Sequence, residues 1–323
     1  MNLIANALKG MAMGIAEVIP GVSGGTIALI TGIYPKLIET ITSFNLKLIR
    51  STLKEGWKGF NAQIDIKFLT SLITGMLLGL LVGIFAITYL YENYPEPLWG
   101  FFFGLILASS IYIARSIKKW KWNDGLVLLI GIVIAYGITI ISPATGSSSF
   151  IYIFISGMLA ITALILPGIS GSFILLLLGM YTVIIPTLKG VITDFSTEGF
   201  LIIVVFASGC LVGIIGFSRV LKYLFQHYER NTMILLTGFM IGSLNKIWPW
   251  RNATTIVDKI SGDRMAANPK DLAALDPDSH KILVEQNVLP QDYWMSDPLI
   301  AATIMSLILG LLSIGVFSLV QKK

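Results

Sequence analysis

A helix-breaking phrase occurs twice in this chain, each time inside apolar sequence. Residues 20–26 read Pro-Gly-Val-Ser-Gly-Gly-Thr, and residues 167–173 read Pro-Gly-Ile-Ser-Gly-Ser-Phe, 147 positions further on. The same spacing pairs Gly10-Met11 with Gly157-Met158, and Gly32 with Gly179. In hydrocarbon, backbone polar groups must be satisfied within the protein, so a broken helix is tolerated only where protein or a cavity surrounds it. Two such breaks in corresponding places are typical of a transporter's substrate site.

The composition predicts an integral membrane protein. Of 323 residues, 55% are hydrophobic and only 13% are charged, against about 25% charged in soluble domains. Apolar stretches recur throughout, so we expect one membrane domain over residues 1–323. We expect no cleavable signal peptide, because residues 1–9 lack a basic segment. The single cysteine, Cys210, excludes an internal disulfide, and no basic-aromatic patch suggests a nucleic-acid partner.

Two kinds of apolar segment are present. Since a crossing needs roughly 20 apolar residues, the sequence predicts six membrane-spanning helices, at about 66–91, 97–115, 124–142, 199–222, 232–248 and 298–320. Two further apolar regions, about 9–34 and 150–188, contain the Pro-Gly phrases. Each of these regions is either a broken spanning helix or a re-entrant hairpin that dips into the membrane and returns.

The distribution of lysine and arginine favours the hairpins, because cytoplasmic loops are rich in these residues. With two hairpins, 16 of the 23 basic residues fall on one side. These are Lys9, the tail Lys322-Lys323, and the basic residues of 35–67, 115–121 and 219–230. With spanning helices instead, 219–230 and the tail would move outside and the acidic segment 249–297 would move inside. We therefore predict that both termini are cytoplasmic.

These patterns predict an all-α membrane protein built as an inverted repeat. Repeat one covers 9–142 and repeat two covers 150–320, each with one re-entrant broken helical hairpin and three transmembrane helices. The odd number of crossings turns the second repeat upside down. Later helices also match: Gly79-x-x-x-Gly83 with Gly209-x-x-x-Gly213, and 104–109 with 238–243. Such glycines indicate close helix packing and are compatible with a homodimer.

Segment 249–297 is the one sizeable polar insert. It has five basic and eight acidic residues. We expect an external cap over the second repeat, with short surface helices possible near Leu272 or Ile282.

The phrases themselves supply candidate substrate-binding residues. Ser23 suits the N-cap of a short helix whose first turn is Gly24, Gly25 and Thr26. Such a turn exposes unpaired N–H groups and the positive end of the helix dipole, and so can hold a phosphate. Ser170, Gly171 and Ser172 match them in the second phrase. The alternative is that the phrases only let two hairpins pack closely.

Two charged residues are further candidates. Glu17 lies three residues before Pro20 in an apolar run, where an ionisable group suggests function. We predict that Glu17 is a coupling or counter-charge residue; alternatively it lies at an aqueous entrance. Its counterpart in repeat two is Leu164. Arg219 could reach a phosphate or Glu17, or it could extend to the interface and set topology.

The outer interface carries a second group of candidates. Lys246 and Arg251 flank Trp248-Pro249-Trp250, where the tryptophans suit interface anchors and the basic pair could attract an anionic headgroup. His227 and His280 are isolated, so no metal site is predicted. We also expect no cofactor.

Residues 17–26, 166–172 and 242–250 resemble the bacterial polyprenyl-phosphate transporter family, and the resemblance extends over nearly the whole chain. It implies a transporter in the bacterial cytoplasmic membrane that moves undecaprenyl phosphate from the outer to the cytoplasmic leaflet for reuse. The family pattern also leads us to expect a basic residue at position 245, where this chain has asparagine, and often an aspartate at position 17.

A proton or sodium gradient would supply the driving force. The chain has no Gly-x-x-x-x-Gly-Lys-Ser/Thr nucleotide motif, and the inside-negative potential opposes inward movement of an anion.

Two other function classes stay open. Membrane-embedded undecaprenyl-pyrophosphate phosphatases also have inverted repeats and a Pro-Gly-x-Ser phrase. Their phrase has an arginine after the serine, where this chain has Gly24, and they carry paired glutamates where Glu17 stands alone. Hydrolysis needs an activated nucleophile or a metal, so we expect no enzyme. The third class is a transporter of another lipid or a small anion.

Overall fold

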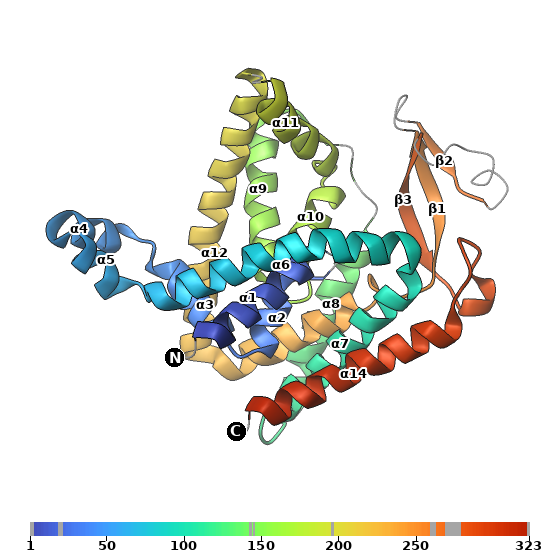
Figure 1. Cartoon of the computed structure of the whole chain (residues 1–323), viewed down its shortest axis with the longest axis horizontal. Coiled ribbons are helices and arrows are strands. Elements are labelled where there is room, and N and C mark those ends of the chain that lie inside the picture. The colour runs from blue at the N-terminus through green and yellow to red at the C-terminus, as the bar shows by residue number, and fades with distance from the viewer. Residues whose placement is uncertain are drawn as a thin grey trace.

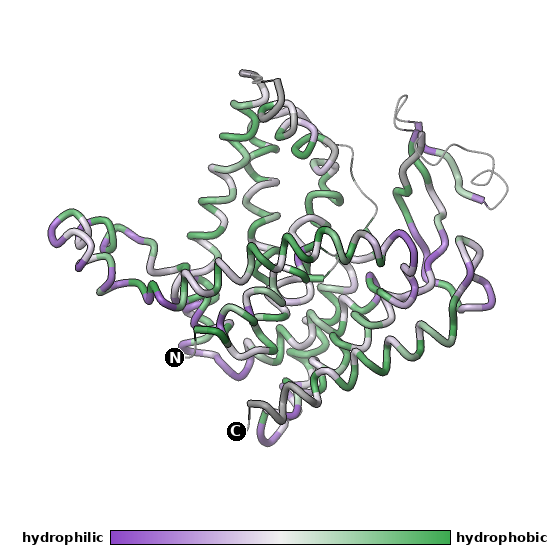
Figure 2. The backbone as a smooth tube through the Cα atoms, in the orientation of Figure 1, coloured by the Kyte–Doolittle hydropathy of each residue, from purple (hydrophilic) through white to green (hydrophobic). Residues whose placement is uncertain are grey.

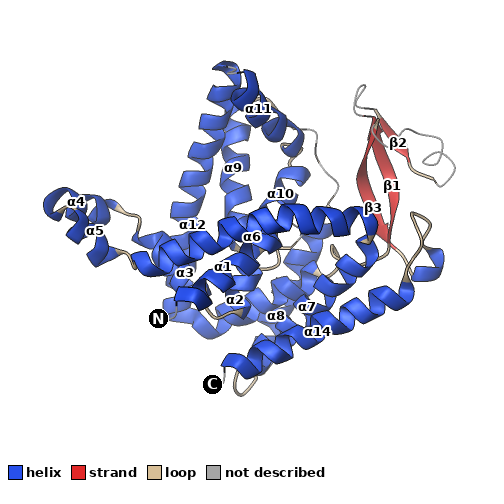
Figure 3. Ribbon diagram, in the orientation of Figure 1, coloured by secondary structure: helices blue, strands red, loops and turns tan. Residues whose placement is uncertain are grey.

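The computed structural model describes residues 3–18, 22–141, 144, 146–194, 197–258, 263–268 and 279–321. Helices make up nearly all of it, with one small sheet at the right of Figure 1. Figure 3 shows the same division by secondary structure. Helix α1 begins and helix α14 ends at the lower left of Figure 1, away from the sheet.

Both predicted phrases interrupt helices. Helix α1 (Leu3–Glu17) is followed by the seven-residue α2 (Gly24–Ile30), and α9 (Phe150–Ile165) by the seven-residue α10 (Gly171–Leu177). Pro20 and Gly21 lie outside the described residues. In the second break Gly168 has φ +83°, a conformation that only glycine adopts at little cost.

Helix α1 packs along α6 (Ile66–Asn93) through glycines. A Cβ atom built on Gly10 would lie 2.3 Å from the carbonyl oxygen of Leu72, and one built on Gly75 would lie 2.0 Å from that of Ala7. Any larger residue would push the two backbones apart, so these glycines set the helix spacing.

Helix α9 packs in the same manner on the first part of α12 (Thr197–Ser243). A Cβ atom on Gly157 would lie 2.4 Å from the Phe206 carbonyl oxygen, and one on Gly209 would lie 2.0 Å from that of Phe154. The spacing of 147 residues that relates the two phrases also relates Gly10 to Gly157.

Two other helix pairs join distant parts of the sequence. Helix α7 (Pro95–Ser116) packs on α14 (Ile300–Gln321), and α8 (Trp122–Ile140) packs on the second part of α12. Cβ atoms on Gly104 and Gly238 would lie 2.1 Å from the Leu307 carbonyl oxygen and 2.5 Å from that of Leu128, respectively.

The predicted separation of helices 199–222 and 232–248 corresponds to a kink at Tyr228 (φ −137°, ψ 37°), where two helical parts of α12 meet directly and not through an extended loop. Below the α12 label in Figure 1 the helix turns sharply. Arg230 follows this bend and forms an ion pair of 2.5 Å with Asp124 at the start of α8. It also donates to the carbonyl oxygens of Lys118 and Lys119, so the bend is fixed to the loop before α8.

The chain is a multi-pass membrane protein by the length and composition of its helices. Within the described residues, four helices are long and apolar enough to cross a bilayer: Ile66–Asn93, Pro95–Ser116, Trp122–Ile140 and Gly199–Ser243. Phe150–Ile165 and Ile300–Gly315 are shorter apolar helices. Apolar residues follow these helices in Figure 2, and large ones such as Phe85, 77% exposed, face outward.

Four shorter helices complete the helical part: α3 (Tyr34–Ser43), α4 (Leu46–Glu55), α5 (Trp57–Gln63) and α11 (Tyr181–Asp194). Helices α4 and α5 project at the left of Figure 1 and carry both hydrophilic and hydrophobic residues in Figure 2.

The polar insert contains a sheet, so the fold is not wholly α-helical. Strands β1 (Arg251–Asp258), β2 (Arg264–Ala266) and β3 (His280–Asn287) form an antiparallel sheet in the order β2-β1-β3. The helix considered near Ile282 is wrong, because Ile282 pairs with Ile256 in this sheet. Leu272 lies outside the described residues.

The insert is tied to both halves of the chain. After the 3₁₀ turn η1 (Pro290–Asp292), Tyr293 donates a 2.6 Å hydrogen bond to the buried carboxylate of Glu96 on α7, and Ser296 donates to the same oxygen. Trp248, just after α12, donates to the Val288 carbonyl oxygen at 2.8 Å.

Candidate functional site

The two helix breaks meet inside the protein. Thr26 Oγ1 accepts a 2.8 Å hydrogen bond from the Gly168 N–H, and the Tyr34 hydroxyl donates to the Ile165 carbonyl oxygen at 3.0 Å. All four residues are buried. A Cβ atom on Gly25 would lie 2.5 Å from the same Ile165 oxygen, so the glycine permits this approach.

Ser23 caps α2 as predicted, and it also joins the two breaks. Its Oγ accepts from the Gly25 N–H at 3.1 Å. The same hydroxyl lies 3.2 Å from the Leu166 carbonyl oxygen and 3.3 Å from that of Leu164. Ser23 is fully buried, so in this arrangement its hydroxyl serves contacts within the protein.

Glu17 occupies the place that the sequence assigned to a bound anion. Its Oε1 accepts a 2.8 Å hydrogen bond from the Gly24 N–H in the first turn of α2. A carboxylate at a helix N-terminus is stabilised by the helix dipole and by the unpaired amides there. The chain therefore places its own carboxyl group at the first turn of α2, where the sequence predicted a bound phosphate.

The start of the matching helix α10, with Ser170, Gly171 and Ser172, has no such carboxyl group. Leu164 stands at the position that matches Glu17, and a Cβ atom built on Gly171 would lie 3.2 Å from the Leu164 Cβ. Ser170 and Ser172 share a hydrogen bond of 2.8 Å between their hydroxyls. Ser170 is N-cap of α10 without a side-chain capping bond. The two predicted phosphate-binding sites, at the starts of α2 and α10, are thus chemically unequal.

The structure does not bring Arg219 to the start of α2 or of α10. Its side chain is exposed on α12 and lines a cavity of about 290 Å³ together with Ile215 and residues of 44–49. Neither Glu17 nor the serines of the two phrases line that cavity.

A polar cavity of about 350 Å³ lies where α8, α10 and the end of α12 face strand β3. Its lining includes Thr139 and Tyr136 of α8, Phe173 of α10, and Lys246 beyond α12. The Lys246 ammonium stands 4.8 Å from the centre of the Phe173 ring. Since Phe173 follows Ser172 directly, this lysine lies close to the start of α10.

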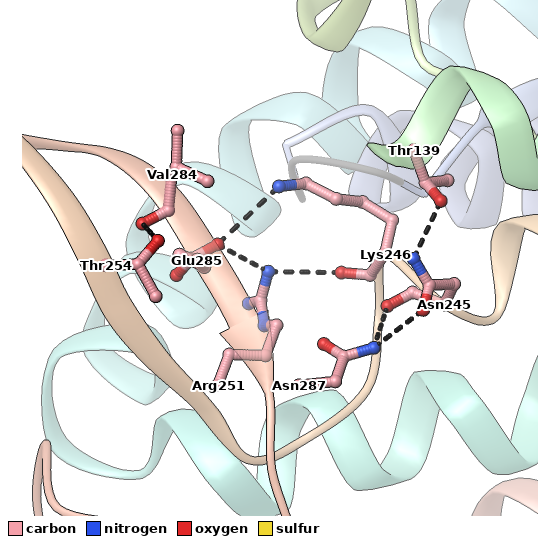
Figure 4. A network of polar contacts seen from close by, with 8 residues as sticks. All are labelled: Thr139, Asn245, Lys246, Arg251, Thr254, Val284, Glu285 and Asn287. Atoms are coloured by element: carbon pink, nitrogen blue, oxygen red, sulfur yellow. Dashed lines mark hydrogen bonds and ion pairs between the residues drawn. The ribbon is translucent and has the colours of Figure 1, made fainter. Parts of the chain in front are cut away.

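Lys246 belongs to a charged network that Figure 4 shows. Its Nζ lies 3.5 Å from Glu285 Oε2, and Arg251 Nη1 lies 2.8 Å from the same oxygen. The Arg251 guanidinium also stacks 4.5 Å from the Trp99 ring centre. Two cations share one carboxylate, so the network has a net charge of +1 beside the cavity.

Burial lowers the pKa of the Lys246 ammonium below its ordinary value, and the Glu285 carboxylate opposes this shift. Desolvation of this kind disfavours the charged form. An anion that binds in the cavity would favour the charged form of Lys246 and so oppose this effect of burial.

Asn245 has a structural position. Its amide donates to Thr139 Oγ1 at 2.8 Å, and its side-chain oxygen accepts from Asn287 Nδ2 at 2.8 Å (Figure 4). It therefore joins α8 to strand β3 at the cavity wall.

Sequence reasoning noticed Lys246 and Arg251 but missed Thr139, Phe173 and Glu285. These three come from an apolar helix, from the second phrase and from the insert, and nothing in their local sequence indicates a common site.

Comparison with known proteins identifies the family. The family model described as "VCA0040-like: Undecaprenyl phosphate translocase-like" matches residues 13–265. The chain belongs to this family. The resemblance inferred from the two phrases is therefore confirmed.

Two relatives extend the match. The chain is 38% identical over 311 residues, 96% of its length and 96% of the relative's, to the "Polyprenyl-phosphate transporter" of Vibrio cholerae serotype O1. It is 34% identical over 259 residues, 76% of its length and 86% of the relative's, to the "Polyprenyl-phosphate transporter" of Staphylococcus aureus. No solved structure matches. Both relatives are named as transporters of a polyprenyl phosphate.

Proposed function

We propose that the protein moves undecaprenyl phosphate from the outer to the cytoplasmic leaflet, driven by a proton or sodium gradient. The extended match to two proteins named polyprenyl-phosphate transporter is the observation on which this rests. The Vibrio cholerae relative is aligned over 96% of the chain, the membrane part and the insert included, so the same substrate class is the simplest expectation.

The headgroup binds first in the Lys246 cavity. Its net positive charge attracts a phosphate, and a buried ammonium gives a stronger electrostatic interaction than an exposed one. Ser170, Gly171 and Ser172 lie at the start of the adjacent α10, where Leu164 brings no competing carboxylate. The adjoining apolar surface of α8 lets an isoprenoid chain stay in the bilayer.

The two halves are inverted repeats, with a correction to the register of the later helices. Contacts support this: Gly75 and Gly209 approach carbonyls of Ala7 and Phe154, which are 147 residues apart like the two phrases. Gly75 thus matches Gly209, and Gly79 matches Gly213 rather than Gly209. In each half a broken hairpin packs on the next helix, and the odd number of crossings in a repeat would make the two hairpins dip from opposite faces.

Glu17 couples transport to an ion. Its carboxylate holds the Gly24 N–H, and protonation or sodium binding would weaken that charge-assisted bond. The freed first turn of α2 (Gly24, Gly25 and Thr26) could then receive the phosphate. Ser23 keeps the two breaks together during this exchange.

Proteoliposomes test the proposal. Radiolabelled undecaprenyl phosphate is supplied outside, and its loss of accessibility to an external phosphatase is measured with and without imposed pH or sodium gradients. We expect protein-dependent protection that is faster with a gradient. Protection without any gradient dependence would remove the coupling, and protection no faster than in protein-free vesicles would overturn the function. Release of phosphate from undecaprenyl pyrophosphate would instead identify an enzyme.

A further inference from the structure

A large apolar cavity of about 710 Å³ lies between α1, α2, α7 and α14 and shares no lining residue with the Lys246 cavity. Its walls are alanine, isoleucine, leucine and phenylalanine side chains, including Ala12, Ile15 and Phe101. Leu8, at its edge, is 61% exposed, so the cavity opens where a bilayer would touch the protein. This volume is within the range of small-molecule sites.

Lys9 is the one charged residue among the described residues that line this cavity. Its half-buried ammonium donates a 2.8 Å hydrogen bond to the carbonyl oxygen of Thr31, at the end of α2. None of the ion pairs in the described part of the chain includes Lys9. An ammonium has three N–H donors, so this bond leaves two for a ligand.

The other half of the chain shows that the carbonyl does not require a charge. Leu178 stands 147 residues after Thr31, and its carbonyl oxygen accepts a 2.8 Å hydrogen bond from the hydroxyl of Tyr152. A neutral phenol there does what the ammonium of Lys9 does at Thr31. Helix capping therefore accounts for the hydrogen bond but not for the positive charge beside an apolar cavity.

We infer that this cavity is a second lipid site, which binds the isoprenoid chain of a polyprenyl phosphate with the phosphate on Lys9. Apolar walls and one unpaired cation complement an apolar chain that ends in an anion. The inference rests on the proposed function and deepens it: Lys246 and Lys9 would serve as headgroup sites at opposite ends of the path.

The experiment is photo-crosslinking of the full-length protein in nanodiscs with a polyprenyl phosphate that carries a diazirine in its first isoprene units. Labelled peptides are mapped by mass spectrometry, and dissociation constants come from competition with unlabelled lipid. We expect label on the α1 segment around Ala12 and Ile15. Label only on outward faces of α6 or α8, or equal competition by phosphatidic acid, would overturn the inference.

Matched variants separate the roles of charge and space. Lys9→Gln should weaken binding of the phosphate lipid on the order of tenfold, as loss of a hydrogen bond to a charged group predicts. It should leave binding of the uncharged polyprenol unchanged, and Lys9→Arg should keep most of the affinity. Lys47→Gln, which removes an exposed lysine on α4, is the control.

Ala12→Trp fills the cavity while keeping the lysine at position 9 and should abolish the α1 label, whereas Ala86→Trp on the exposed face of α6 should not. Unchanged labelling in both Lys9→Gln and Ala12→Trp would refute the second site while leaving the proposed function intact. Failure of the wild-type protein to prefer polyprenyl phosphate over polyprenol would count against the function itself.

Discussion

At the scale of single residues, the chain assigns different tasks to residues that look alike in sequence. Ser23 and Ser170 occupy the same place in the two phrases, but within the described residues Ser23 bonds to the opposite break and Ser170 bonds to its neighbour Ser172. Glu17 and Leu164 occupy matching positions, and only Glu17 supplies a charge. The capping role of Ser23 could be predicted from local sequence. Its contacts with residues more than 140 positions away could not, because they depend on how the hairpins meet.

Lys246→Met should raise the lipid concentration for half-maximal uptake on the order of tenfold, because the cavity loses its net charge. Lys246→Arg should retain most of the affinity. The measurement is uptake into proteoliposomes at varied lipid content, with Lys222→Met, in the middle of α12, as a control. An unchanged half-saturation in Lys246→Met would exclude the cavity as the headgroup site.

The same lysine predicts a pH dependence. Since burial lowers the pKa of Lys246, the charged form is lost as pH rises, starting below the range of an exposed lysine. Uptake should therefore decline on the alkaline side, and Lys246→Arg should move that decline to higher pH, because arginine stays protonated. Superimposable profiles of the two proteins would contradict this.

Glu17→Gln should slow uptake at least tenfold and remove its dependence on the imposed gradient. Stability should change by about 1 kcal/mol or less, because the glutamine oxygen can still accept from the Gly24 N–H. Uptake and thermal unfolding are measured side by side, with the exposed Glu39→Gln as control. Retained gradient dependence would show that coupling lies elsewhere.

Arg219 offers a contrasting case. Because its side chain lies exposed beside residues 44–49, Arg219→Ala should leave the half-saturating lipid concentration within about twofold of wild type, as expected of a surface charge. A tenfold rise in that assay would restore Arg219 as a headgroup ligand.

At the scale of elements, the sequence predicted the membrane helices and the two breaks well, because hydropathy and Pro-Gly signals are local. It also separated the two parts of α12, although they meet at a kink at Tyr228 and not in the expected loop. It also missed the sheet. Strand β3 pairs with β1 across a segment of mixed polarity. The sequence around Ile282 therefore shows neither the 3.6-residue period of a helix nor the two-residue period of a strand clearly.

Glycine contacts at this scale can be tested within one helix. A Cβ atom on Gly131 of α8 would lie 2.5 Å from the Leu235 carbonyl oxygen, whereas nothing lies within 4 Å of one on Gly137. Gly131→Ala should lower the free energy of unfolding by about 1–3 kcal/mol. Gly137→Ala should raise it by up to about 1 kcal/mol through helix propensity. Denaturant titration in detergent compares them, and equal effects would refute glycine-mediated packing of α8 on α12.

At the scale of the whole molecule, the predicted orientation stays a prediction that labelling can decide. In a Cys210→Ser background, a cysteine at Lys54 on α4 and one at Met265 on β2 should react with an impermeant maleimide from opposite faces of the membrane. Lys54 should be protected in intact cells and Met265 should be labelled. Labelling of both from outside would reverse the assignment of the termini and the insert.

The packing of α7 on α14, and of α8 on the second part of α12, has a mechanical consequence. In both pairs a helix of the first half packs on a helix of the second half. The halves therefore cannot move as two separate rigid bodies without breaking these glycine-mediated contacts. These four helices instead form a fixed frame. We therefore predict that passage of cargo moves the other two packed pairs, α1 with α6 and α9 with the part of α12 before Tyr228, relative to this frame, whose share of α12 is the part after Tyr228.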